Sequence, residues 1–266
     1  MTGESVPILW DTTGEPSAFD PADWFAYCED ITARPAPRLP PLAVQSVIPG
    51  HRQLVETSFG GTFDDFTLAE HPFCLIHYAG HEIVVGISAK GSYAAGGLDE
   101  LIGLGAQSII VLGGCGSLVP ELHVGDFFAP TKALRDDGVS LHYEPASRYS
   151  FPSDSLTSCL LQAARAAGYP AKAGPVWSTT AHFRQTIPRL EAFRQEGCMA
   201  VNNEGAAAFS VGRFRGAEVA SLLVVGDTLA SGRFTVPAGQ QPLDAAAGTL
   251  MEVALQALVM ASGEDR

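Results

Sequence analysis

The stretch Ser108–Ser117, with the sequence SIIVLGGCGS, decides the fold class. Its first half, residues 108–112, contains the short apolar run IIVL, typical of a strand that is buried on both faces of a parallel sheet. Gly113, Gly114 and Gly116 follow at once, so we expect the chain to turn sharply at the carboxyl end of this strand. Ligands of α/β sheets usually bind at such strand ends. The segment therefore predicts an α/β protein with a candidate binding loop.

The rest of the chain alternates β-type and helical patterns around this strand. Short apolar runs between glycine-rich or polar segments predict strands, and apolar residues at helical spacing predict crossover helices. The alternation indicates a single α/β domain with a central mixed, largely parallel sheet flanked by helices. Strands are expected at residues 73–78, 83–87, 124–130, 173–178, 198–201 and 219–225, and helices at residues 93–104, 155–167, 206–214 and 245–260.

Length and composition fit one domain that buries its own core. The chain has 266 residues, of which 46% are hydrophobic and 17% are charged, as in globular proteins. The first segment is rich in proline and acidic groups, so we interpret residues 1–41 as an N-terminal arm outside the main core. Residues 42–266 then form the main domain. The arm is expected to lie on the surface or against a partner subunit.

The charge balance argues against several classes of partner. The formal net charge is −13, which repels nucleic-acid phosphates and anionic lipid head groups. No run approaches the roughly 20 apolar residues of a membrane span, and no basic-then-apolar leader opens the chain. The five cysteines are scattered, and no His or Cys pair has zinc-ligand spacing. We therefore expect a cytoplasmic protein with reduced thiols, no metal site, and neither nucleic acid nor membrane as a partner.

A second predicted strand end carries the polar segment Asn202, Asn203 and Glu204. A carboxylate at this place can accept hydrogen bonds from both vicinal hydroxyls of a ribose. The same residues also suit the start of a helix, with the asparagines as caps and Glu204 in the first turn. Both interpretations are open from the sequence alone.

A third strand end carries Asp227, which closes an apolar run. A carboxyl group that emerges from a buried strand is partly desolvated, so its pKa should rise and it can serve as a general acid. A turn or cap aspartate is the alternative. The glycine segment has two interpretations as well: backbone N–H groups that cradle an anion or sugar, or a tight structural turn. Three predicted strand ends thus carry polar or glycine-rich residues, and their occurrence together is stronger evidence for a binding site than any one of them alone.

Taken together, these segments resemble the nucleoside phosphorylase superfamily, which includes uridine phosphorylase and hexameric purine nucleoside phosphorylase. The strongest part is residues 113–143, GGCGSLVPELHVGDFFAPTKALRDDGVSLHY, in which several residues match at fixed spacing. Residues 177–186, 196–209 and 214–227 follow in the family's order, and the resemblance covers about residues 42–262. It implies the nucleoside phosphorylase fold and a catalytic role for the main domain.

The resemblance also implies roles for individual residues. Glu204 occupies the position that binds the ribose hydroxyls, and Asp227 the position of the acid that serves the base nitrogen in purine-cleaving members. Phe183 falls in the segment that contributes an aromatic ring to the base. Gly50 and Arg52 stand near a glycine and an arginine that hold phosphate in relatives, although the spacing here is shorter. The other substrate-binding positions that it implies are Gly113, Gly114, Gly116, Thr179, Asn202 and Asn203.

Two departures from the family pattern bear on the co-substrate. Relatives usually carry an arginine and a threonine or serine where this chain has Val111 and Gly114, so part of the usual phosphate site is missing. The family's E-M-E motif is reduced to Asn202-Asn203-Glu204, which retains only the last carboxylate.

The activity that the resemblance implies is that of a pentosyltransferase. It would cleave a nucleoside, with purine favoured and uridine possible, and would use inorganic phosphate as co-substrate without a cofactor. One alternative is a nucleosidase that uses water at the same site. Another is a catalytically inactive nucleoside-binding protein of the same fold. The family also implies a homo-oligomer, either a dimer or a trimer of dimers.

Overall fold

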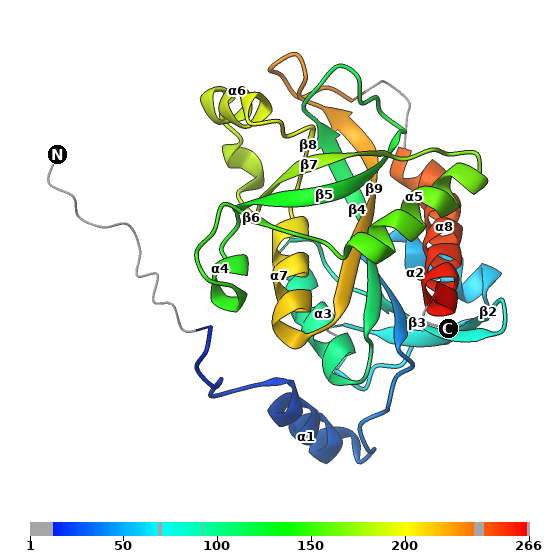
Figure 1. Ribbon diagram of the computed structural model, residues 1–266. Coiled ribbons are helices and arrows are strands. Elements are labelled where there is room, and N and C mark those ends of the chain that lie inside the picture. The colour runs from blue at the N-terminus through cyan, green and yellow to red at the C-terminus, as the bar shows by residue number, and fades with distance from the viewer. Residues whose placement is uncertain (1–12, 69–70, 92, 237–241, 265–266) are drawn as a thin grey trace, which may run out of the picture.

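Strand β4 (Ser108–Ser117) lies at the centre of the sheet in the computed structural model, which describes residues 13–68, 71–91, 93–236 and 242–264 (Figure 1). It pairs in parallel with β1 (Leu42–Ser46) and with β9 (Glu218–Thr228). Beyond β1 comes the parallel strand β3 (His81–Ile87), and β2 (Phe73–Tyr78) pairs with β3 in the antiparallel direction. The mixed, largely parallel sheet expected from the sequence is confirmed.

The other half of the sheet closes into a five-stranded barrel, formed by β4, β9 and the three strands described next. β5 (Phe127–Asp136) pairs with β9 at one end and, in parallel, with β7 (Lys172–Thr179). β7 pairs with β8 (Ala200–Asn202), and β8 returns to β4 in the antiparallel direction. The short β6 (Tyr149–Ser150) pairs with β5 in the antiparallel direction. Closure of the barrel brings the carboxyl ends of β4, β8 and β9 to one place.

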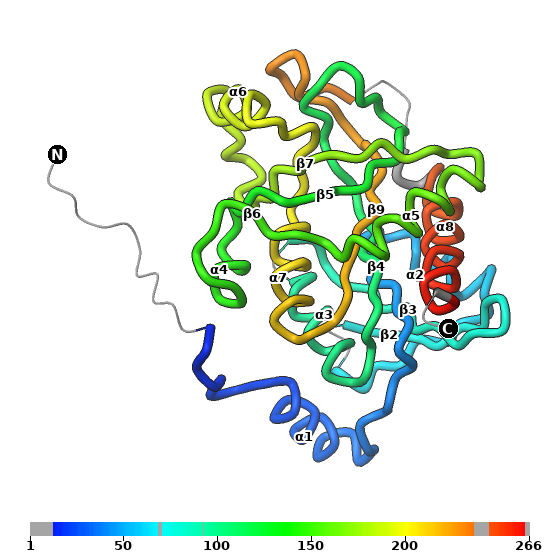
Figure 2. The backbone as a smooth tube through the Cα atoms, viewed as in Figure 1, coloured from blue at the N-terminus to red at the C-terminus, as the bar shows by residue number. Residues whose placement is uncertain are grey.

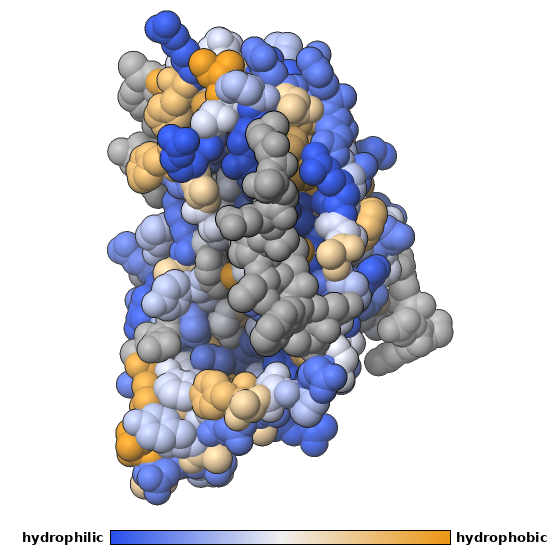
Figure 3. Space-filling model, turned by 90° about the vertical axis from the view of Figure 1, so that its left-hand side faces the viewer, coloured by the Kyte–Doolittle hydropathy of each residue, from blue (hydrophilic) through white to orange (hydrophobic). Residues whose placement is uncertain are grey.

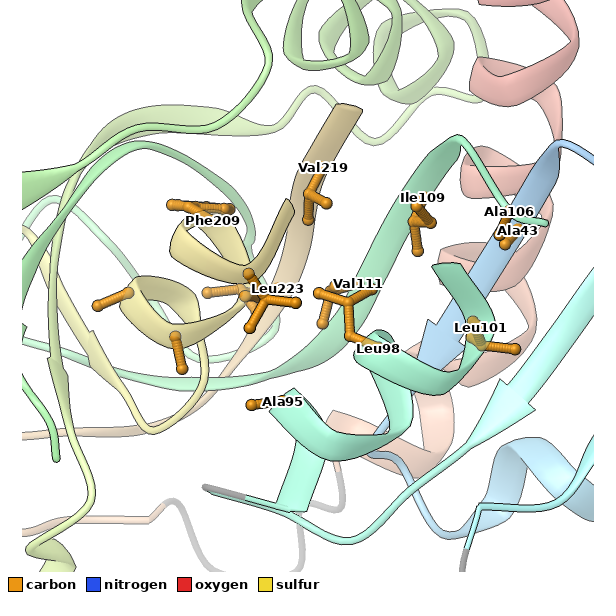
Figure 4. Packing of buried hydrophobic residues seen from close by; sticks show 14 of the residues in the cluster. Ala43, Ala95, Leu98, Leu101, Ala106, Ile109, Val111, Phe209, Val219 and Leu223 are labelled. Carbon is orange, nitrogen blue, oxygen red and sulfur yellow. The ribbon is translucent and has the colours of Figure 1, made fainter. Parts of the chain in front are cut away.

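Helices α3 (Tyr93–Gly103) and α7 (Gly205–Arg215) pack together on one face of the sheet. Figure 4 shows their side chains meeting alternate residues of the central strand, among them Ile109 and Val111. Phe209 belongs to the same buried cluster. Because one face of β4 is covered here and the other by a second helix layer, the run IIVL at residues 109–112 is apolar throughout.

The second layer consists of α5 (Asp154–Ala166), α2 (Gly50–Ser58) and the C-terminal α8 (Pro242–Glu264). Within α8, the segment Ala245–Gly263 is long and apolar enough to cross a membrane by length and composition. The expectation that the chain has no such run is therefore wrong. Side chains along α8 such as Leu250 are fully buried against α5 and the sheet, as in the core helix of a globular domain.

Helix α1 (Pro21–Thr32) forms the described part of the N-terminal segment and lies beside α3 at one end of the molecule (Figure 2). Asp20 caps it by accepting the N–H groups of the first turn. Phe25 and Cys28 are buried in the same cluster as the α3 residues. The expectation that this segment lies outside the main core does not hold for these two side chains. Residues 1–12 of the expected arm lie outside the described ranges.

Three short elements complete the fold: α4 (Ser140–Tyr143), the 3-10 helix η1 (His182–Arg184) and α6 (Ile187–Gln195). Helices α4 and α6 lie on the side of the molecule that Figure 3 shows, where hydrophilic residues predominate and apolar residues stand in small groups between them. The element η1 follows the carboxyl end of β7, so it lies at the same edge of the barrel as the ends of β8 and β9.

The glycine segment does not turn the chain, contrary to the expectation. β4 continues through it to Ser117 and stays paired with β9 along its whole length. The register shifts once, so that Gly226 is passed over and Gly116 pairs with Asp227. Such a bulge bends the strand and re-aims the side chain next to it. The glycines therefore shape a strand end rather than a loop.

Candidate active site

A cavity of about 720 Å³ opens where β4, β8 and β9 end, a size suited to a small-molecule ligand. Its inner wall contains the backbone of Gly114 and Gly116 on β4 together with Glu204 and Asp227. The barrel explains why these residues meet, since Gly116 pairs with Val201 of β8 on one side and with Asp227 of β9 on the other. The structure thus brings together the three strand ends that the sequence singled out.

Glu204 lies between β8 and α7 and is only 4% exposed. Although it is the N-cap residue of α7, its side chain makes no capping bond. One carboxylate oxygen accepts the N–H of Gly91 at 2.8 Å, and the other accepts the N–H of Asn203 at 3.2 Å. Burial raises the pKa of Glu204, while these two hydrogen bonds and the charge of Lys90 oppose the rise. Glu204 therefore precedes the first turn of α7 rather than lying in it, and backbone groups in the cavity wall hold its side chain.

Asp227 lies at the end of β9 and is half-buried, and no hydrogen bond to its side chain is found among the described residues. Burial raises its pKa, and the nearby charges of His182 and Lys90 partly oppose that rise. Gly116 makes room for it: a Cβ at that position would lie 2.5 Å from Asp227 Oδ1. The second carboxylate is thus desolvated but free to meet a ligand.

Asn202 also contributes to the wall and is 5% exposed. Its Oδ1 accepts the N–H of Gly205 at 3.4 Å, a long cap for α7. Its Nδ2 is buried without a hydrogen-bond partner among the described residues. Buried polar groups are rarely left unpaired, so this donor is well placed to meet a ligand. Asn203 lines the cavity beside it.

The cavity rim carries residues that the sequence analysis missed or placed only by resemblance. Phe183 and His182 come from η1, and their rings meet edge to face with centroids 5.0 Å apart. Lys90 follows β3, and Phe234 follows β9. β3 runs parallel to β1, and β9 runs parallel to β4. Ligands of α/β sheets usually bind beyond the carboxyl ends of such strands, so the positions of Lys90 and Phe234 in the sequence could have indicated them. Gln185 and Cys115 also line the cavity.

Four of the expected substrate-binding residues do not line the cavity. Arg52 lies on α2, where its guanidinium is 3.3 Å from Glu56 and 4.8 Å from the centre of the Phe63 ring. Gly50 opens that same helix. Thr179 is buried at the end of β7 and accepts the N–H of Ala181 at 3.3 Å. Gly113 lies within β4, where it pairs with Leu223 of β9.

The position of α2 has a local cause in the buried His51. Its Nδ1 is 2.7 Å from the Ser46 hydroxyl and its Nε2 is 3.0 Å from the carbonyl oxygen of Ala247. Burial lowers the pKa of His51 to about 4, so the ring is neutral and links α2 to β1 and α8. This link holds the helix against the second layer.

The cavity lining carries two carboxylates, Glu204 and Asp227, but few positively charged side chains. Among the described lining residues, Lys90 is the one lysine, and arginine is absent. Val111, where the sequence resemblance implied an arginine, is 1% exposed and belongs to the buried cluster that includes α3 residues. The described residues also contain no group of three or more His, Cys, Asp or Glu side chains placed to hold a metal ion.

A family model described as the phosphorylase superfamily matches residues 42–258. The chain belongs to this superfamily. Among curated relatives, a guanosine phosphorylase of Halorubrum lacusprofundi is 27% identical to this chain over 140 residues. The match covers 52% of this chain and 58% of that one. The chain is 29% identical over 92 residues to a uridine phosphorylase of Salmonella typhimurium, over 35% of this chain and 36% of that one. The chain thus spans between about a third and three fifths of these relatives.

Solved structures agree on the fold. An AMP nucleosidase from Bacteroides thetaiotaomicron superposes with a TM-score of 0.71 and 18% identity over 91% of this chain and 99% of that one. A P knowlesi homolog of P falciparum PNP gives a TM-score of 0.71 and 21% identity over 92% of this chain and 93% of that one. At this identity the likeness establishes the fold that the sequence resemblance implied, and does not extend to the reaction.

Proposed function

We propose that this chain cleaves the N-glycosidic bond of a nucleoside, with Glu204 and Asp227 acting on opposite sides of the breaking bond. The observation that carries the proposal is the meeting of two carboxylates with different surroundings in one cavity. Burial raises the pKa of both, but one is held by two backbone N–H groups, whereas the other has no hydrogen bond from the described residues. Pairs of titratable groups set apart in this way are typical of acid–base sites.

Glu204 is placed to bind and stabilise the sugar. Bond breaking builds positive charge on the ribose, and a nearby carboxylate stabilises that charge. The N–H groups of Gly91 and Asn203 fix the carboxylate. Each oxygen still has acceptor capacity for a ribose hydroxyl. Orientation of this kind, established before the substrate binds, contributes to catalysis.

Asp227 is placed to serve the base. As the bond breaks, negative charge builds on the departing base, and a protonated carboxyl group can donate to a ring nitrogen. The raised pKa of Asp227 increases the protonated fraction at a given pH. A purine ring nitrogen needs such an acid more than uracil does, so we infer that purine nucleosides are the preferred class and uridine the second.

Inorganic phosphate is the nucleophile that we infer first, without an organic cofactor. Lys90 supplies the positive charge, since it lines the cavity and its charge opposes the rise in pKa of both carboxylates. The backbone of Gly114 can approach the anion closely, because no side chain intervenes.

Water is the second candidate nucleophile, and the lack of arginine among the described lining residues supports it. Arg52 is directed toward Glu56 and Phe63, and the described lining contains no arginine. Without a bidentate phosphate ligand, a nucleosidase reaction at the same two carboxylates is chemically sufficient.

Incubating purified chain with a panel of purine and pyrimidine nucleosides, with and without inorganic phosphate, tests the proposal. We expect free base in phosphate buffer, together with ribose 1-phosphate. Base release at equal rate without phosphate, with free ribose as product, would assign the nucleosidase reaction. Binding of nucleosides without release of any base would contradict the proposal and identify an inactive binding protein.

We also infer a cytoplasmic homo-oligomer, either a dimer or a trimer of dimers. All five cysteines are buried and stand as thiols, which fits a reducing compartment. Phe19, Tyr93 and Phe214 leave large apolar side chains exposed around a second cavity near α1, a surface that a neighbouring subunit can cover. Light scattering at working concentration should give the mass of a multimer, and a monomer would contradict this inference.

A further inference from the structure

The chain folds back directly after Asp227 in a hairpin that borders the cavity. Thr228 and Thr235 exchange two backbone hydrogen bonds, each 2.9 Å long. Between them, the N–H of Gly232 donates to the carbonyl of Leu229 at 2.8 Å, and Gly232 has a φ of +80° that glycine adopts without strain. Residues 228–235 are therefore a hydrogen-bonded structure.

Two further contacts fix this hairpin to the body of the molecule. The N–H of Leu229 donates to the carbonyl of Ser117 on β4 at 2.7 Å, and the Leu229 side chain is buried in a cluster with Trp177. Arg194 of α6 donates from Nη2 to the carbonyl oxygens of Leu229 and Ala230, at 3.3 and 3.1 Å. Figure 1 shows the loop after β9 beside α6. The hairpin is thus held from both the barrel and the helix.

This anchored hairpin presents an aromatic ring at the cavity. Phe234 lines the cavity and is 66% exposed, and Phe183 on the separate element η1 lines it while 94% exposed. Exposed apolar surface costs free energy in water, and a patch of it beside polar groups is typical of a ligand site. The hairpin begins one residue after Asp227, which places Phe234 on the side of the cavity assigned to the departing base.

We propose that Phe234 forms a second aromatic wall of the base subsite, facing the ligand together with Phe183. The ligand class is a planar heteroaromatic base, because stacking on an aromatic ring uses the flat face of the ligand and tolerates different bases. The sugar does not contact this wall, since Glu204 holds it from the side of Gly91. This inference rests on the proposed function and assigns the residues of its base subsite.

Calorimetric titration of free purine and pyrimidine bases into the purified chain tests this assignment. Phe234→Ala should weaken base binding by roughly 5- to 100-fold, the range for loss of one stacking ring, and should raise the nucleoside KM more than it lowers kcat. Phe234→Tyr keeps the ring and should restore binding. Phe151→Ala is the matched control, because Phe151 is also exposed, at 49%, but lines a different cavity. The control should bind bases as the wild type does.

The outcomes separate this inference from the function on which it rests. If wild-type protein releases base from nucleosides while Phe234→Ala binds bases as tightly as wild type, the aromatic wall is overturned and the proposed function stands. If wild-type protein binds no base and releases none, both are overturned. Since Phe234 is exposed, thermal unfolding of the alanine variant should match that of wild type.

Discussion

The inner wall of the cavity and its rim are built in different ways. The inner wall stands at the ends of barrel strands, where Glu204 is 4% exposed and accepts two backbone N–H groups. The rim consists of elements added to the barrel, and its two rings, Phe183 and Phe234, are 94% and 66% exposed. Protein backbone thus fixes one region, whereas the other presents side chains to solvent.

This difference separates chemistry from recognition. A group fixed by strand pairing keeps its geometry whatever base is bound, so changes there should act mainly on kcat. A group on the exposed rim contributes binding that is similar in the ground state and the transition state, so changes there should act mainly on KM. The variants that follow test this division.

The largest effect is expected at Asp227. Asp227→Asn preserves shape and removes the proton, so turnover of nucleosides with ordinary bases should fall roughly 10²- to 10⁴-fold. An analogue with an activated leaving group, such as a nitrophenyl riboside, should be cleaved nearly as before. Steady-state kinetics on both substrates checks this, and equal losses would assign Asp227 to binding or folding.

The raised pKa of Asp227 also predicts a pH effect on stability. Because its folded pKa lies above the ordinary value of 3.8, the folded state binds more protons than the unfolded state between the two values. The free energy of unfolding therefore falls as pH rises through that window. Asp227→Asn removes this penalty, so its Tm should exceed that of wild type at neutral pH, and the gap should close near pH 3.8. A gap that stays constant with pH would count against the raised pKa.

Glu204 should give the next largest loss of activity. Glu204→Ala removes a charged hydrogen-bond partner of the sugar, so kcat/KM should drop by at least about 100-fold. Glu204→Gln keeps one acceptor oxygen and should lose less. Circular dichroism checks that both variants fold. Near wild-type turnover of the best nucleoside by the alanine variant would remove Glu204 from the site.

Gly116 connects the strand pairing to the acid. In Gly116→Ala the new Cβ would lie 2.5 Å from Asp227 Oδ1, so the carboxyl group must move. Misplacement of a catalytic group on this scale should lower kcat roughly 10- to 100-fold. Gly86→Ala is the control, since its Cβ would lie 2.9 Å from Leu101 Cδ1 and neither residue lines the cavity. It should lower Tm and leave kcat close to wild type; the reverse pattern would break the account of the bulge.

Lys90 on the rim should give the smallest effect. Lys90→Ala should raise the KM for phosphate about 10-fold and leave the nucleoside KM nearly unchanged, the cost of losing one charged contact. Arg52→Ala is the informative partner, because the sequence resemblance assigns phosphate to Arg52 whereas its guanidinium faces Glu56. A larger effect from Arg52→Ala would show that the sequence was right about this residue.

Local patterns predicted the fold class well. The apolar strands and the α/β alternation were readable because burial on both faces forces continuous apolar runs, as in β4. The continuation of β4 through its glycines was not readable, since pairing with β9 overrides the tendency of glycine to turn. Closure of the barrel depends on contacts between strands far apart in the sequence, which no local pattern contains.

Residues of the candidate site could likewise be predicted only where a local sequence pattern marks them. Glu204 and Asp227 were singled out because each stands at the end of a predicted buried strand, and both line the cavity. Lys90 and Phe234 were missed, although they too follow strands, because a lysine or phenylalanine in a loop has no distinctive local pattern. Arg52 was transferred on a shortened spacing, and α2, tied by His51, places it outside the cavity lining.

The most direct test of the central claim is chromatographic measurement of free base released from a purine nucleoside in phosphate buffer at neutral pH. Wild type and Asp227→Asn should be assayed in parallel at matched concentration. The account predicts that wild type releases base and ribose 1-phosphate and that the variant releases at least about 100-fold less. Equal release by the two proteins, or no release by wild type from any nucleoside, would contradict it.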